Sequence, residues 1–186
     1  PIMLELIAKH PKATYDYLEY RRDVEGIAAG YAAERATEHD KALLTDIMTR
    51  MEAAHGYESY QEEAELDIDF HNAVCESAHN ILLMHALRSC YRVLANGVFF
   101  SRALVYGLPG ARDELLQQHR AVYDAIMAGD AQAARRAAQA HMEFVEKYSR
   151  EAERAKSWET MSELRRAQRL ETAERPAGQK PQKKAS

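Results

Sequence analysis

Apolar residues recur along the chain at three- and four-residue spacing, which is the period of amphipathic helices. No stretch alternates polar and apolar residues for long enough to indicate a strand. Glycine and proline are scarce and fall mostly at the joints between the periodic segments. The pattern predicts helices over residues 14–36, 37–56, 58–78, 81–105, 112–128 and 130–148. Because short connections join them, we expect an all-α fold, an antiparallel bundle of six or seven helices.

The predicted joints carry residues that are suited to capping helices. Thr14 is suited to begin the first helix, and Thr37 with Asp40 resembles a capping box in which Asp replaces Glu. Asp130 directly follows a glycine, a combination typical of one helix closing and the next being capped. His79-Asn80 interrupts the pattern, so we expect a break or kink between the third and fourth helices.

Composition divides the 186-residue chain into three parts. Residues 1–13 form a lead-in or linker, and residues 14–150 hold the periodic pattern of a single domain. Residues 151–186 carry nine Lys and Arg against six Asp and Glu, and they end in a polar, proline-containing stretch. We therefore expect a helical extension and a basic, disordered tail after residue 150.

Charge, hydropathy and cysteine content exclude several classes of protein. A net charge of −4 excludes a chain that coats nucleic acid along its whole length. The sequence has no run of about 18 uncharged apolar residues and no signal-peptide pattern, so we expect no membrane association. The two cysteines, Cys75 and Cys90, do not make a disulfide framework, which favours a reducing cytoplasm.

Ionisable residues fall within or beside three of the apolar stripes. His119 lies in the stripe of the fifth helix, His141 lies in that of the sixth, and Asp67 and His71 are four residues apart on the third. Burying these groups without partners would cost on the order of several kcal/mol. A divalent metal would bind all four, because it takes neutral imidazole nitrogens and a carboxylate oxygen directly. The alternative is that each histidine is a buried structural residue bonded to a neighbouring carbonyl or hydroxyl.

Two Glu-x-x-His motifs offer a different kind of metal site. They are Glu52 with His55, and Glu76 with His79. Di-iron proteins built on helical bundles use two such motifs in mid-helix positions that face each other. Here both motifs fall at helix ends on consecutive helices, so a di-iron site is the weaker hypothesis.

Arginine residues on the predicted inner faces are candidates for binding an anion. Arg21 lies on a partly apolar side of the first helix, with Glu25 one turn later. An inward-facing arginine needs an anionic partner, which is either Glu25 or a bound carboxylate. Both alternatives stay open from the sequence. Arg102 on the fourth helix is a similar candidate.

Several separated blocks of the sequence resemble the FCD domain, the C-terminal effector domain of FadR-type regulators in the GntR family. Residues 67–80, DIDFHNAVCESAHN, are similar to its Asp-x-x-Phe-His and Ala-Ser-x-Asn signature. Residues 118–130, QHRAVYDAIMAGD, followed by His141 resemble its second block, and residues 21–25 resemble its first-helix Arg-x-x-x-Glu pattern. The resemblance covers residues 15–148.

This resemblance implies a helical bundle that binds an effector, forms a homodimer and regulates transcription. In the metal-binding branch of the family, one Asp and three His hold a divalent transition metal such as Zn, Ni, Mn or Fe. Those positions correspond to Asp67, His71, His119 and His141. Within the family, the sequence is most similar to those of the regulators of lactate, glycolate and pyruvate use. This similarity implies a small 2-hydroxy or 2-oxo carboxylate as effector. The residues expected to bind that effector are Arg21, Arg102 and Asn80.

The regulators that the chain resembles also carry an N-terminal winged helix-turn-helix. The chain opens with Pro1 and the resemblance begins within the first 20 residues, so we expect an isolated effector domain. Operator DNA would then be bound only through the missing N-terminal domain. The alternatives are a helical-bundle metalloenzyme that uses the same four ligands, and a purely structural dimerisation bundle. We expect no enzymatic activity, because no separate general base is convincingly placed.

Overall fold

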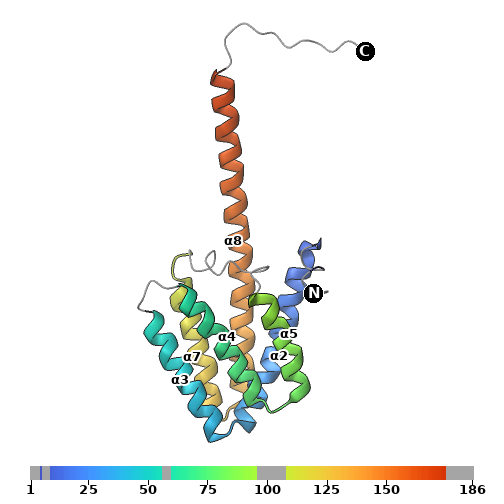
Figure 1. Ribbon diagram of the computed structural model, residues 1–186, viewed down its shortest axis with the longest axis vertical. Coiled ribbons are helices and arrows are strands. Elements are labelled where there is room, and N and C mark those ends of the chain that lie inside the picture. The colour runs from blue at the N-terminus through green and yellow to red at the C-terminus, as the bar shows by residue number, and fades with distance from the viewer. Residues whose placement is uncertain (1–4, 6–8, 56–59, 96–107, 175–186) are drawn as a thin grey trace. The chain divides into compact units, whose positions relative to one another are not determined.

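The computed structural model describes residues 5, 9–55, 60–95 and 108–174 (Figure 1). These residues contain six helices and no strand, which confirms the predicted all-α fold. The helices are α2 (Pro11–Arg35), α3 (Glu38–His55), α4 (Tyr60–Ser77), α5 (Ile81–Ala95), α7 (Ala111–Met127) and α8 (Ala131–Glu174). By its internal contacts the chain divides into two compact units, Pro1–Arg150 and Glu151–Ser186.

The helix ends follow the capping chemistry of the sequence, with one exception. The Thr37 backbone N–H donates to Asp40 Oδ2 over 2.7 Å, and the Asp40 N–H donates back to Thr37 Oγ1 over 3.3 Å, which confirms the capping box. Asp130 Oδ1 accepts from the backbone N–H of residues 132 and 133 and so caps α8. The expected start at Thr14 is wrong, because α2 begins at Pro11, whose fixed φ suits the first helical position.

The break between α4 and α5 lies where the sequence places it. His79 adopts a positive φ of 48°, and Asn80 Oδ1 accepts from the Leu83 backbone N–H over 3.1 Å at the start of α5. The predicted continuation of this helix from residue 96 to 105 lies outside the described residues. No helix within the described ranges is long and apolar enough to cross a membrane.

The main hydrophobic core brings α3, α4 and α7 together with α2 and the first turns of α8. Leu44 and Met48 of α3, Phe70 of α4 and Ile126 of α7 are each at most 1% exposed in this cluster. Burying a side chain of this size contributes about 1.5–3 kcal/mol. The core therefore fixes the facing sides of α4 and α7, which carry three of the four predicted metal ligands.

Two glycines allow α2 to approach α8 closely. A Cβ atom at Gly26 would lie 2.8 Å from Cγ of Gln139, and one at Gly30 would lie 3.3 Å from the Ala131 carbonyl oxygen. The lack of side chains at these positions therefore sets the spacing of the two helices. Glu25, adjacent to the first glycine, lines one small cavity together with His141 of α8.

Candidate metal centre

Four side chains from three helices converge inside the bundle. Asp67 and His71 come from α4, His119 from α7 and His141 from α8, and all are between 3% and 8% exposed. One potential ligand atom from each lies within 4.8 Å of the corresponding atoms of the other three. The structure thus brings together the four residues that the sequence pattern and the family resemblance single out.

Helix geometry explains how these side chains meet. Asp67 and His71 are four residues apart, so both project from one side of α4. Phe70 lies between them in sequence and packs edge-on against His119, with ring centroids 5.1 Å apart. The same helix therefore supplies two of the potential ligands and an apolar wall that orients a third.

Each of the three imidazoles uses its Nδ1 atom to contact a neighbouring acceptor. The contacts are His71 Nδ1 to Glu25 Oε2 (2.8 Å), His119 Nδ1 to the Leu115 carbonyl oxygen (2.8 Å) and His141 Nδ1 to Gln118 Oε1 (3.1 Å). An acceptor at Nδ1 favours the tautomer that carries its hydrogen there, which leaves the Nε2 lone pair unprotonated. Metal-binding histidines commonly have such partners, since the second contact fixes the orientation of the ring.

His119 Nε2 provides the clearest test of whether a metal would fit. Among the described residues, this buried atom has no hydrogen-bond partner. It lies 3.3 Å from Asp67 Oδ1, but with the hydrogen on Nδ1 the facing atoms are both acceptors. Leaving such an atom buried and unsatisfied costs about 1–3 kcal/mol. A cation between the nitrogen and the carboxylate would remove this cost, so the four residues fit a metal ion.

The protonation state of His141 is also suited to a metal. Burial is the largest effect that holds the pKa of His141 well below its usual value, and the neighbouring His119 and His71 lower it further. His141 is therefore neutral near pH 7. A metal binds the neutral form of imidazole, so no proton has to be displaced from this ring.

Arg21 and Glu25 form a buried ion pair behind His71. Arg21 Nε donates to Glu25 Oε1 over 2.6 Å, and the two side chains are only 4% and 5% exposed. Burial alone would raise the pKa of Glu25, but Arg21 and then His71 outweigh it and lower the pKa to about 2. The Arg21 guanidinium also lies 5.8 Å and 5.5 Å from the ring centroids of Tyr17 and Tyr91. Glu25 is thus ionised, and it links Arg21 to His71 of the four-residue cluster.

The structure describes two of the three residues expected to bind the effector. Of the two partners that the sequence left open for Arg21, the structure shows the pairing with Glu25. A contact between Arg21 and the effector stays a prediction. Asn80 caps α5 and lines neither of the two small cavities beside the cluster. Arg102 lies outside the described residues.

Small cavities flank the cluster on two sides. One of about 10 Å³ is lined by Glu25, His71, Tyr91 and His141, among others. The other, of about 30 Å³, reaches His119 and Asp67 from the side of α3 and the first turns of α7. Its polar lining includes three residues that sequence reasoning did not select for this site: His55, Glu63 and Arg112. Spacing alone could have found the last two, since Glu63 precedes Asp67 by one helical turn and Arg112 precedes His119 by two.

The two Glu-x-x-His motifs do not form a common site. Glu52 pairs with Arg120, and His55 Nε2 lies 2.8 Å from Asp113 Oδ1. In the second motif Glu76 pairs with Arg88, and His79 Nε2 lies 2.9 Å from Asp40 Oδ2. Among the described residues the motifs are thus engaged in separate ion pairs, which removes the support for a di-iron site.

Comparison with known proteins assigns this bundle to a class of regulatory domains. The sequence profile of the FCD domain matches residues 16–144. A protein named as a regulatory protein of the L-lactate dehydrogenase operon in Escherichia coli (strain K12) is 40% identical over 140 residues, which cover 75% of this chain and 53% of that protein. The Glc operon transcriptional activator of the same strain is 32% identical over 148 residues, covering 78% of this chain and 58% of the activator. The chain belongs to the FCD domain family.

A solved structure supports the same fold. A GntR protein of Streptococcus agalactiae superimposes with a TM-score of 0.61 at 22% identity, covering 72% of this chain and 58% of that one. The chain spans about half the length of the curated relatives it matches. These relatives are named as regulators, which confirms the expectation of a regulatory domain rather than an enzyme.

Proposed function

We propose that this chain is the metal-containing, ligand-sensing and dimerisation domain of a bacterial transcription regulator. The observation that carries the proposal is the set of ligand atoms from Asp67, His71, His119 and His141 within 4.8 Å of one another. The Nδ1 contacts of the three histidines support it, because they orient the Nε2 atoms for binding. One carboxylate and three imidazoles suit Zn, Ni, Mn or Fe.

The proposed effector is a small 2-hydroxy or 2-oxo carboxylate of the lactate, glycolate or pyruvate class. A divalent ion held by one carboxylate and three neutral imidazoles keeps a net positive charge, which attracts an anion with two neighbouring oxygen donors. The similarity to a protein named for the L-lactate dehydrogenase operon supports this class. The role of the protein side chains is to hold the ligand set rigid: Glu25 and Gln118 fix two imidazole rings from behind.

The proposed regulation works by linkage between two binding events. The effector must bind one arrangement of the whole regulator more tightly than the other in order to change its affinity for DNA. We propose that residues 14–150 bind the effector and form the homodimer, and that operator DNA is bound by a part of the regulator outside this chain. The residues after 150 would form an extension, and the regulator would work in the cytoplasm.

A thermal-shift titration tests the proposal. The zinc-loaded chain is melted with L-lactate, glycolate or pyruvate, and with L-lactamide and 1,2-propanediol as controls that lack the carboxylate. At one hundred times its dissociation constant, a ligand adds about 2.7 kcal/mol to stability, which corresponds to a rise of roughly 5–11 °C in Tm for a protein of this size. The neutral controls should leave Tm unchanged. Equal shifts with L-lactamide, or no shift with any of the three carboxylates, would contradict the proposed effector class.

A further inference from the structure

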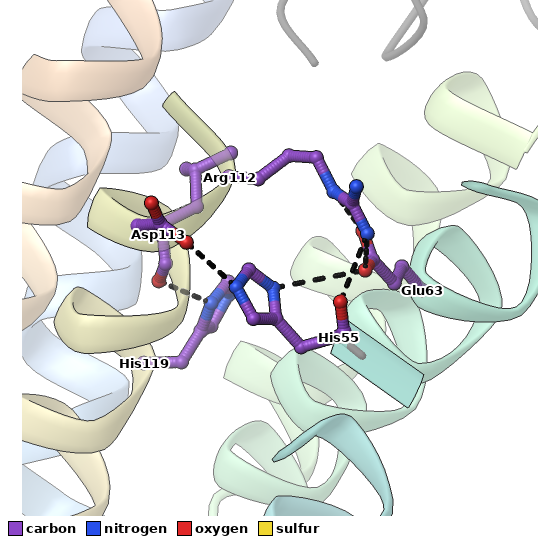
Figure 2. A network of polar contacts seen from close by, with 6 residues as sticks. His55, Glu63, Arg112, Asp113 and His119 are labelled. Carbon is purple, nitrogen blue, oxygen red and sulfur yellow. Dashed lines mark hydrogen bonds and ion pairs between the residues drawn. The ribbon is translucent and has the colours of Figure 1, made fainter. Parts of the chain in front are cut away.

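The larger cavity beside the metal ligands is bordered by an ion pair that joins α4 to α7. Arg112 donates through Nε to Glu63 Oε2 over 3.2 Å, and its terminal nitrogen binds the other oxygen of the same carboxylate. The same nitrogen also donates to the His55 carbonyl oxygen over 3.2 Å. Figure 2 shows Arg112 and Glu63 facing each other, with His55 between Glu63 and Asp113. A guanidinium thus holds a carboxylate through two donors at the edge of this cavity.

Helix spacing places this pair next to the metal-ligand cluster. Glu63 precedes Asp67 by one turn of α4, so their Cβ atoms are about 5–6 Å apart. Arg112 precedes His119 by two turns and projects from the same side of α7. All four side chains line one cavity of about 30 Å³.

The two arginines close to the cluster differ in how they could meet an incoming anion. Arg21 is 4% exposed and contacts the cluster through Glu25, beside a cavity of only about 10 Å³. Arg112 is 24% exposed and lines the larger cavity directly. An anion that reaches His119 through this cavity would pass the Arg112 side chain.

We propose that Arg112 binds the carboxylate of the effector and that Glu63 occupies its place in the ligand-free domain. The inference rests on the proposed function, because it assigns a residue to the effector of the same site. The paired oxygens of Glu63 present to Arg112 the same planar group that a carboxylate effector carries. Effector binding is then an exchange of one carboxylate for another on the same guanidinium.

Glu63 has a second partner within reach when Arg112 turns to the effector. His55 Nδ1 lies 3.7 Å from Glu63 Oε1, while His55 Nε2 contacts Asp113. A small movement would bring the Glu63 carboxylate into hydrogen-bond distance of this ring. The Asp113 carboxylate is exposed and can bind water in place of His55, so the ring can donate its hydrogen to Glu63 instead. The exchange then leaves no carboxylate buried without a partner, which would otherwise oppose it.

Paired variants with opposite expected effects test this proposal. Affinity for L-lactate is measured by titration calorimetry on the zinc-loaded full chain, after metal content and thermal unfolding have been checked. Arg112→Gln should weaken binding by roughly tenfold to a hundredfold, the effect of losing a charge-assisted hydrogen bond. Glu63→Gln should tighten binding, because it removes the charge that competes for Arg112. Metal content should stay unchanged in both variants.

Another ion pair of α7, which joins that helix to α3, provides matched control variants. Arg120 and Glu52 also form an ion pair, but neither lines the cavity. Arg120→Gln and Glu52→Gln should leave L-lactate affinity unchanged.

Two outcomes would overturn the assignment of Arg112 and leave the proposed effector class standing. One is that the Arg112→Gln variant binds L-lactate as tightly as the wild type does. The other is that a folded Glu63→Gln variant binds L-lactate no more tightly than the wild type does. The Glu63→Gln test holds even if Arg112→Gln fails to fold. If the metal-loaded wild type binds none of L-lactate, glycolate and pyruvate, the proposed effector class fails together with this inference.

Discussion

Replacing Arg21 by alanine separates a structural role of this residue from direct contact with the effector. The guanidinium is buried between Tyr17 and Tyr91 and is paired with Glu25. Its removal leaves the Glu25 carboxylate buried with the hydrogen bond from His71 Nδ1 as a remaining partner. Because a buried charge needs compensation, we expect the variant to be less stable.

The expected loss can be estimated from the burial of the pair. Removing one partner of a buried ion pair costs about 3–5 kcal/mol, and the contact to His71 favours the lower half of this range. A loss of about 3–4 kcal/mol corresponds to a fall of roughly 6–16 °C in Tm for a chain of this length. If Arg21 also holds the effector carboxylate, L-lactate binding would weaken by about 1.5–3 kcal/mol, or roughly tenfold to a hundredfold.

Thermal unfolding and titration calorimetry on the same metal-loaded preparation distinguish these roles. From the geometry of the pair we expect a large fall in Tm with nearly unchanged L-lactate affinity. The double variant Arg21→Met with Glu25→Met should recover much of the stability, since an apolar pair of similar size replaces the two charges. An unchanged Tm combined with a tenfold loss of affinity would refute this reasoning and place Arg21 in the effector site.

Three further predictions address the metal ligands and the helix cap. Glu25→Gln should weaken zinc affinity by roughly tenfold to a hundredfold in a chelator competition, because Glu25 orients a ligand ring; equal affinities would contradict this. His119→Ala should lower metal occupancy and Tm together, whereas the exposed control His39→Ala should change neither. Burial would raise the pKa of Asp40, but its bonds to Thr37 and His79 lower it. The ionised Asp40 carboxylate therefore contributes its full stabilisation above the pKa of about 3.9 that it has in the unfolded chain. This stabilisation is lost as the pH falls through the lower pKa that Asp40 has in the folded chain. In urea unfolding, Asp40→Ala should cost about 0.5–2 kcal/mol at pH 7 and less at pH 3, and a constant difference would argue against the ionised cap.

Local periodicity explains why the fold and the four candidate metal ligands could be predicted from the sequence. The three- and four-residue spacing predicted the helices, and the spacing of Asp67 and His71 placed both on one side of α4. Helix capping also depends on neighbouring residues, so the capping box could be predicted from Thr37 and Asp40 alone. The exception at Pro11 is also local, because proline at the first helical position competes with a later cap at Thr14.

Contacts between distant helices set the limit of sequence reasoning. The Arg112–Glu63 pair joins residues 49 positions apart, and periodicity does not specify which helices face each other. The sequence likewise left two partners open for Arg21, a neighbouring glutamate or a bound anion. The Arg21–Glu25 pair lies within α2, one helical turn apart, but its continuation to His71 depends on α2 lying against α4, and the structure supplies that contact.

Metal analysis of the purified chain tests the central claim most directly. The chain is prepared without chelators, and its metal content is measured by inductively coupled plasma mass spectrometry before and after dialysis against EDTA. Four ligand atoms within 4.8 Å of one another predict one divalent transition-metal ion per chain. Removal of that ion should lower Tm, and its return should restore Tm. A chain that carries no metal and gains no stability from added Zn, Ni, Mn or Fe would contradict the account.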